Sequence, residues 1–231
     1  MNQVIAALQW LADGANWSGP GGLLARTWEH LWYTALALVV GAVVAVPLGM
    51  YIGHTGKGRT FAVGVSGAVR ALPSLGLLTL LAVSMGLGLG WAVVPSTIVL
   101  ALLAVPSLLA ATYSGFDQVP DDVVDGARAT GFSELQIVGR VELPLALPLM
   151  VGGLRAAALQ VLATATISAY LGLGGLGRFI LDGLSVSDYP RMLGGAIAVG
   201  GLALAVDGLI LVVQRLVVPR GVHVAVGPTD A

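Results

Sequence analysis

The sequence has no cysteine and only three histidines, His30, His54 and His223, which lie far apart along the chain. A chain without cysteine cannot form a disulfide, a thiolate metal site or a cysteine nucleophile, and isolated histidines do not make a set of metal ligands. It also has no Gly-x4-Gly-Lys-Ser/Thr motif, the loop that cradles the phosphates of ATP. We therefore expect no catalytic residue, no metal site and no cofactor bound by this chain.

Charge is also scarce in the 231 residues. Charged residues make up 10% of the chain and hydrophobic residues 57%, whereas soluble domains carry about 25% charged residues. The formal net charge of −1 leaves no basic surface that would favour nucleic acid. The composition predicts an all-α, polytopic (multi-pass) protein of the lipid bilayer that does not bind nucleic acid.

Five apolar runs are long enough to cross a bilayer, which takes about 20 helical residues. They are Leu31–Ile52, roughly Phe61–Ser84, roughly Leu89–Tyr113, roughly Leu147–Leu171 and Met192–Val213. We predict five core transmembrane helices in a membrane domain over residues 31–216, after an external or interfacial segment 1–30 and before a cytoplasmic tail 217–231. Within the first segment, Val4–Leu11 lacks a basic leader and is predicted to be an interfacial helix, not a signal peptide.

The basic residues of the loops predict the orientation, because cytoplasmic loops carry an excess of Lys and Arg. With an external N-terminus, the inner side receives Lys57, Arg59, Arg128, Arg140, Arg215 and Arg220, and the outer side receives Arg26, Arg178 and Arg191. This excess predicts an N-out, C-in topology. It places the polar segment between the third and fourth runs in the cytoplasm.

The first apolar run repeats small residues every four positions, at Ala37, Gly41, Ala45 and Gly49. This spacing lines one helical face with residues that let another backbone approach closely. The pattern predicts tight helix packing and no direct contact with a substrate.

The polar segment Asp117–Glu142, called the insert below, holds six of the twelve carboxylates of the chain. Pro120 is well suited to the start of a helix, and Asp121 and Asp122 in the first turn favour the positive end of the helix dipole. Gly131 is predicted to end this helix. The insert therefore begins with a short acidic helix.

A second short helix is predicted directly afterwards. Ser133-x-x-Gln136 has the spacing of a capping box, and Pro144 limits how far the helix continues unbroken. Helices this short are marginal in water unless they pack against something. From these residues alone, two interpretations stay open: an amphipathic loop lying on the membrane surface, or a loop that docks on a partner protein.

The amino-acid sequence of the insert resembles a known motif. Asp125-Gly126-Ala127, three residues, Gly131, nine residues and Val141-x-Leu143-Pro144 is similar to the "EAA" loop of bacterial ABC importer permeases, Glu-Ala-Ala-x3-Gly-x9-Ile-x-Leu-Pro. The departures at Asp125, Gly126 and Val141 are mild in size or charge. The coupling residues that the resemblance implies are Asp121, Asp122, Asp125, Gly126, Ala127, Gly131, Ser133, Glu134 and Pro144.

This resemblance also implies partners. The insert would be a coupling loop, residues 117–142, seated in a groove of an ABC ATPase subunit, and ATP and Mg would bind to that separate chain. An external substrate-binding protein would deliver the solute. The chain would act as a homodimer, or as a heterodimer with a related permease, in the bacterial inner (plasma) membrane.

Two further segments narrow the family. Arg70–Leu78, with the sequence RALPSLGLL, is similar to a segment of osmoprotectant permeases, which import glycine betaine, carnitine or choline. Ile167–Gly177, with the sequence ISAYLGLGGLG, is similar to a segment of those proteins and of methionine-type permeases. The scattered aromatic residues form no box for a quaternary ammonium, so the resemblance assigns recognition to the external binding protein. Methionine or another small solute is the alternative substrate.

Ionisable residues within the spans need partners, because an unpaired charge there costs at least about 2.5–3.5 kcal/mol. Arg155 and Asp207 lie at similar predicted depths and are expected to form a structural ion pair. Arg70 either extends towards the inner face or lines the translocation pathway with Pro73 and Ser74.

The hydroxyls of Thr164 and Ser168 also have two interpretations. They either bond within or between helices, or they line the translocation pathway.

Three other classes fit the sequence less well. A secondary transporter normally shows an internal repeat, which five spans and one insert do not provide. An intramembrane enzyme needs a cluster of nucleophile, base or metal ligands. Gly172-x-Gly174-x-x-Gly177 matches a dinucleotide fingerprint in letters, but a membrane span precedes it where a strand is required. We expect a flexible helix end or an external hairpin there.

Overall fold

A computed structural model describes residues 2–217, so most of the predicted cytoplasmic tail, and with it His223, lies outside the described residues. The described part is helical and contains no strand. Its α-helices are α1 (Asn2–Ala12), α2 (Leu23–Thr55), α3 (Arg59–Ala71), α4 (Ser74–Met85), α5 (Val93–Asp117), α6 (Asp121–Ala129), α7 (Glu134–Ile137), α8 (Leu143–Ala165), α9 (Gly177–Ser185) and α10 (Tyr189–Val217). Three 3-10 turns and one π-helical turn connect them.

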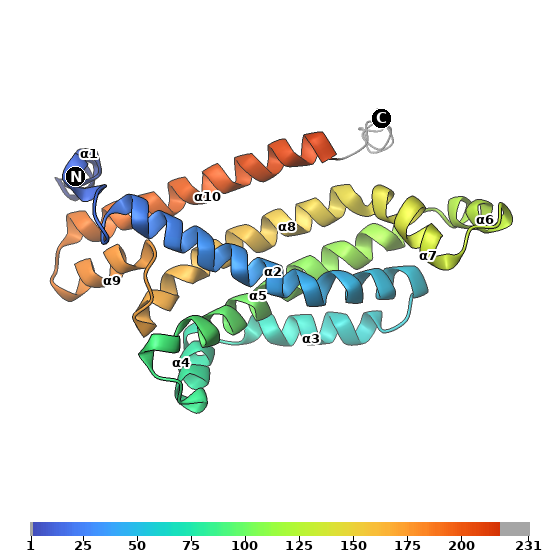
Figure 1. The fold of residues 1–231 in the computed structure, drawn as a ribbon, viewed down its shortest axis with the longest axis horizontal. Coiled ribbons are helices and arrows are strands. Elements are labelled where there is room, and N and C mark those ends of the chain that lie inside the picture. Colours follow the sequence, from blue (N-terminus) through green and yellow to red (C-terminus); the bar gives the residue numbers. More distant parts are fainter. Residues whose placement is uncertain (1, 218–231) are drawn as a thin grey trace.

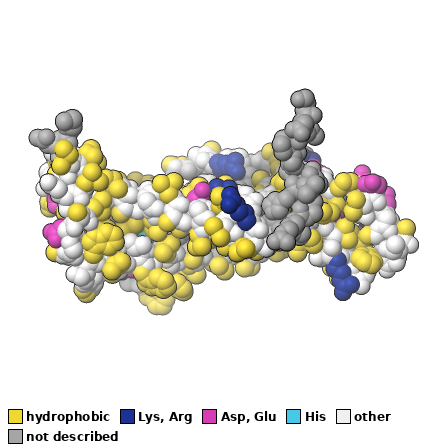
Figure 2. Space-filling view, turned by 90° about the horizontal axis from the view of Figure 1, so that it is seen from above, with side chains coloured by type: hydrophobic (Ala, Val, Ile, Leu, Met, Phe, Trp, Pro, Cys, Tyr) yellow, Lys and Arg dark blue, Asp and Glu magenta, His cyan; other side chains and the backbone are white. Residues whose placement is uncertain are grey.

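The long helices form an elongated bundle in which α2, α5 and α8 make the centre and α10 lies against α8 and α9 (Figure 1). The helices α2, α3, α5, α8 and α10 run along this bundle, and the start of α2 and the end of α10 lie at opposite ends of it. Hydrophobic side chains cover much of the bundle surface (Figure 2). Within residues 2–217, four helices are long and apolar enough to cross a membrane, or five spans result if the bent pair α3 and α4 is one of them. The predicted all-α membrane fold is confirmed.

The small residues of the first span pack as predicted. Ala37, Gly41, Ala45 and Gly49 are all buried, on the face of α2 that meets α5. A Cβ added at Gly49 would stand 2.6 Å from Cβ of Thr112. The contact between α2 and α5 therefore depends on the missing side chain.

Replacing Gly49 with valine should destabilise the protein by about 1–3 kcal/mol, because the added methyls overpack the contact with α5. Gly200→Val is the matched control, since a Cβ at Gly200 in α10 meets nothing within 4 Å. Thermal unfolding in detergent should show a clearly lower midpoint for Gly49→Val than for Gly200→Val. Equal midpoints would contradict this packing account.

The predicted second span, roughly Phe61–Ser84, is not one straight helix. It breaks at Leu72, whose ψ is 131°, and α3 and α4 meet at an angle of 87°. The cause is Pro73, because a residue that precedes proline is pushed out of the helical region into extended geometry. With 13 residues, α3 is about 20 Å long at 1.5 Å per residue, shorter than the hydrocarbon core.

The first span and the N-terminal segment also differ in detail from the prediction. α2 already begins at Leu23, so the boundary predicted between residues 30 and 31 lies inside a helix. The helix predicted over Val4–Leu11 forms as α1 and packs on α10. Trp10 makes the contact: its ring meets the ring of Phe179 edge to face, with centroids 5.2 Å apart, and covers Gly194.

Candidate functional site

The insert projects from one end of the bundle as two short helices (Figure 1). α6 starts after Pro120 and carries Asp121 and Asp122 in its first turn. Gly131 follows it with φ of 89°, a left-handed conformation that favours glycine. α7 begins at a capping box in which the Ser133 N–H donates to Oε1 of Gln136 at 2.9 Å. The predicted pair of helices with its glycine hinge is confirmed.

Pro144 acts differently from a helix stop. The chain continues from α7 through the π-helical turn Val138–Glu142 into α8, and Pro144 lies in the first turn of α8. Proline cannot donate the backbone hydrogen bond that a continuous α-helix would need. The π turn lies just before Pro144 and changes the register of the backbone hydrogen bonds there, so the insert continues into α8 without a loop.

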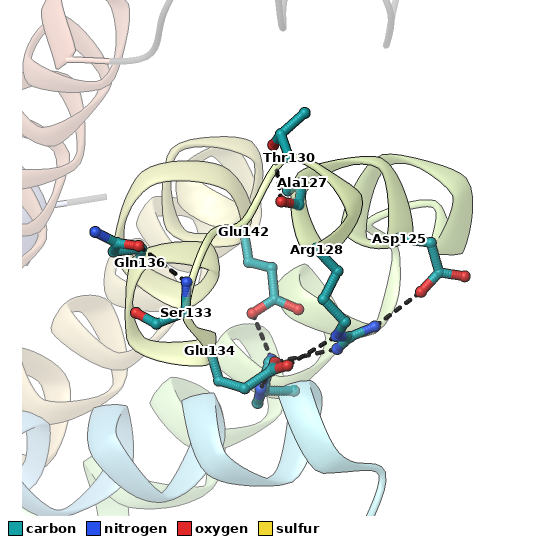
Figure 3. Close-up of polar contacts among 9 residues, drawn as sticks. Asp125, Ala127, Arg128, Thr130, Ser133, Glu134, Gln136 and Glu142 are labelled. Carbon is teal, nitrogen blue, oxygen red and sulfur yellow. Dashed lines mark hydrogen bonds and ion pairs between the residues drawn. The ribbon is translucent and has the colours of Figure 1, made fainter.

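Arg128 ties the two helices of the insert together (Figure 3). Its guanidinium makes a two-pronged contact with Glu134, with Nε donating at 2.7 Å and Nη2 at 3.1 Å, and Nη1 donates to Asp125 Oδ1 at 2.8 Å. The contact with Glu134 is the main cause that raises the pKa of Arg128, so this side chain stays charged. The contact with Glu134 joins α6 to α7, and the contact with Asp125, which lies in α6 itself, holds the guanidinium in position.

His54, in the last turn of α2, connects the insert to the bundle. Its Nδ1 lies 2.8 Å from Oε2 of Glu142 and its Nε2 lies 3.2 Å from Oε2 of Glu134. Glu142 is only 4% exposed, so its carboxylate depends on this partner. A neutral imidazole donates from one nitrogen and an imidazolium from both. A network of polar contacts therefore links α6 and α7 to α2 and to the start of α8. Its members are Arg128, Glu134, His54 and Glu142.

The free surface of the insert combines carboxylates with exposed apolar side chains. Leu135 is 86% exposed, and Val123 and Phe132 are also exposed. None of the residues of α6 is buried, and a Cβ at Gly126 would meet nothing within 4 Å. Large apolar side chains left open beside charged ones are typical of a surface that a membrane or another protein covers. The small residues Gly126 and Ala127 leave the α6 backbone open to close approach.

The polar network of the insert includes three residues that are not among the coupling residues predicted from the sequence. They are Arg128, His54 and Glu142. No local signal points to the pair, since 88 positions separate His54 from Glu142. The unpredicted feature is the connection from the insert to the bundle.

Arg155 and Asp207 are brought together by the packing of α8 on α10. Arg155 Nε donates to Asp207 Oδ1 at 2.9 Å and Nη2 donates to Oδ2 at 2.8 Å. Both side chains are about two-thirds buried by the protein itself. A two-pronged pair of this kind satisfies both charges within the bundle.

Because each charge satisfies the other, Asp207→Asn and Arg155→Gln should each lower the yield of folded protein. The double variant should lose less than the sum of the two single losses, since the first change already removes the pair. Folded yield after detergent extraction, measured by size-exclusion chromatography, tests this expectation. Losses that add up would show that the two residues act independently.

Between residues 2 and 217, the residues predicted for a translocation pathway line none of the five main pockets. Arg70 lies in the last turn of α3, with Nη2 3.5 Å from Oγ of Ser107 in α5. Pro73 precedes α4, and Ser74 is its first residue. Thr164 donates to the carbonyl of Gln160 at 2.8 Å.

Ser168 is buried in the 3-10 turn after α8. A pocket between this turn and α4 is lined by Leu75, Thr166, Ile167 and Tyr170 among others, and none of the five predicted pathway residues lines it.

The glycine-rich segment after this 3-10 turn is fixed against α2 by a hydrogen bond and is not a flexible helix end. The Gly175 N–H donates to Oε2 of Glu29 in α2 at 2.7 Å, and φ of Gly175 is 85°. A Cβ at Gly174 would overlap the Glu29 carboxylate. Helix precedes the segment where a dinucleotide site needs a strand, so the glycines serve close approach to α2.

Comparison with known proteins gives a matching family model and relatives that agree with it. Residues 45–221 match the family model described as "Binding-protein-dependent transport system inner membrane component". The glycine betaine/carnitine/choline transport system permease protein OpuCB of Bacillus subtilis is 32% identical over 96% of this chain and 97% of its own length. The choline transport system permease protein OpuBB of the same organism is 32% identical over 88% of this chain and 92% of its own length.

A solved structure is similar in fold. A chain of the MetNI methionine ABC transporter in inward-facing conformations superimposes with a TM-score of 0.71, covering 92% of this chain and 98% of its own length. Sequence identity is 22%, so this likeness concerns the fold alone.

Proposed function

Because the chain belongs to the binding-protein-dependent transport system inner membrane components, the permease subunits of ABC importers, we propose that it imports quaternary-ammonium osmoprotectants such as glycine betaine, carnitine or choline. The observation that carries this proposal is the 32% identity with the glycine betaine/carnitine/choline permease over nearly the whole length of both chains. The chain is a multi-pass inner-membrane component. Family membership also decides against a secondary transporter.

The insert is the proposed seat of an ABC ATPase subunit, which would bind ATP and Mg. Its exposed Leu135 beside the carboxylates of α6 suits a groove in a partner. In the proposed N-out, C-in topology, the insert would lie in the cytoplasm and the N-terminal end outside, where a substrate-binding protein would deliver the solute. A second permease, identical or related, completes the pathway.

The polar network suggests how force passes into the bundle. Closure of the ATPase pair would push on α6, and Arg128 would carry the movement to α7 through Glu134. His54 touches both Glu134 and Glu142 and would pass it to α2 and α8. We propose that the bend at Pro73 belongs to the part of the translocation pathway that moves in response. The other residues proposed for this part are Arg70, Ser74, Thr164 and Ser168.

Uptake in cells tests the substrate. Cells with and without the gene are grown in high salt, and uptake of radiolabelled glycine betaine and choline is measured with unlabelled carnitine or methionine as competitor. We expect uptake to be lost without the gene and to be reduced by carnitine. Unchanged uptake would overturn the osmoprotectant assignment, and competition by methionine alone would move the substrate to methionine.

A further inference from the structure

A narrow apolar groove runs between α2 and α3, near the turn that joins them. The two helices are antiparallel, and α3 packs against α5 and hardly touches α2 (Figure 1). The space left between them has a volume of about 320 Å³. Its floor is made by buried Ile52, Ala62 and Leu109, and its rims carry exposed Leu48 and Phe61.

The groove follows the helices. On α2 it extends from Val44 to Ile52 and on α3 from Phe61 to Val69, which is about 12 Å on each side at 1.5 Å per residue. Because α2 crosses the membrane, the groove runs in the direction of the lipid acyl chains. Its lining is almost entirely apolar, as a hydrocarbon ligand requires.

Lys57 lies at the mouth of the groove, in the turn between the two helices, and is the one charged side chain among its described lining residues. It makes no ion pair with any residue from 2 to 217. Arg59 nearby is already engaged, since Nη1 donates to Asp117 at 2.9 Å and the guanidinium lies over the ring of Tyr113. The ammonium of Lys57 is therefore open to an anion at the end of an apolar groove.

We propose that this groove binds one acyl chain of an anionic phospholipid, with Lys57 at its headgroup phosphate. A cation at one end of an apolar groove about 12 Å long matches the headgroup phosphate and the first part of one acyl chain of such a lipid. A second copy of the chain fits less well, because an apolar helix seated here would cover Lys57 and leave a buried ammonium without a partner. The site is independent of the transported solute.

Tryptophan fluorescence can report on the groove directly. The native tryptophans are Trp10, Trp17, Trp28, Trp32 and Trp91, and they lie towards the other end of the bundle. Phe61→Trp places a new one on the rim with little change of shape. The complete transporter carrying this change is reconstituted in phosphatidylcholine vesicles with small amounts of brominated phosphatidylglycerol or brominated phosphatidylcholine, both of which quench tryptophan.

The brominated phosphatidylglycerol should quench Phe61→Trp at about fivefold lower mole fraction than the brominated phosphatidylcholine, the preference that one basic residue near the surface supplies. Adding Lys57→Gln should abolish this preference. Leu209→Trp, on an exposed part of α10 away from the groove, should show none. Equal quenching of Phe61→Trp by both lipids would overturn the proposal, and so would quenching by neither, which would indicate a protein segment in the groove.

A second measurement avoids the inserted tryptophan. Native mass spectrometry of the detergent-extracted complex should show retained phosphatidylglycerol that Lys57→Gln removes. Arg215→Gln is the matched control, because Arg215 is an exposed basic residue at the end of α10 that does not line the groove. Equal retention by the two variants would contradict a role for Lys57.

Discussion

Gly131→Trp should abolish docking of the ATPase and reduce solute uptake to background, while the chain still inserts in the membrane. Gly131 lies between α6 and α7 on the exposed insert, and a Cβ there meets nothing of this chain within 4 Å. An indole would therefore extend into the space of the partner. It would also strain the backbone, because φ is 89°. Co-purification of the ATPase with tagged permease, together with uptake, measures the effect.

Gly131→Asn separates strain from bulk. Asparagine tolerates the left-handed conformation better than other side chains do and is much smaller than tryptophan. We expect this variant to keep most of the docking and uptake. Normal uptake by Gly131→Trp would refute the coupling role of the insert.

His54→Leu should lower uptake by about tenfold or more. The change leaves the buried Glu142 carboxylate without the partner at 2.8 Å, and an unsatisfied buried group costs about 1–3 kcal/mol. It also removes the contact between α2 and Glu134 of α7. Uptake and thermal stability, both normalised to the amount of folded protein, measure the two consequences.

Two companion variants assign the cause. His54→Gln can still donate a hydrogen bond to Glu142 and should keep most of the stability. The double variant His54→Leu with Glu142→Leu should recover stability, because replacing both partners by apolar groups avoids the unpaired carboxylate. It should not recover uptake, since the link from the insert to α2 is still cut. Full activity of His54→Leu would contradict the proposed path.

Local signals were sufficient to predict the insert. Pro120 begins α6, Gly131 provides the left-handed hinge, and Ser133 with Gln136 caps α7. Each of these effects acts within a few residues, so it can be recognised without knowledge of the fold. The same is true of the small-residue face of α2.

Features that depend on contacts between distant segments could not be predicted in this way. The start of α2 was placed too late because Arg26, Glu29 and His30 are polar. In the fold, Glu29 bonds Arg26 and the Gly175 N–H, and His30 Nε2 lies 2.9 Å from the carbonyl of Leu162. These partners satisfy the polar groups, so the helix extends through them.

The bend in the second span had a local signal that the apolar composition outweighed. Leu72-Pro73 favours extended geometry at Leu72, but the run on both sides is hydrophobic enough to suggest one crossing. The link from His54 to Glu142 had no such signal. Its existence depends on the end of α2 lying beside the π turn before α8.

Site-specific cross-linking tests most directly whether the insert docks on an ATPase. The chain has no cysteine, so Leu135→Cys provides a unique site for a maleimide photo-cross-linker at an 86% exposed position of the insert. Leu204→Cys, 76% exposed on α10, is the matched control. In native membranes, illumination should join the ATPase to Leu135→Cys and not to Leu204→Cys. No ATPase adduct at Leu135→Cys, or equal adducts at both positions, would contradict the account.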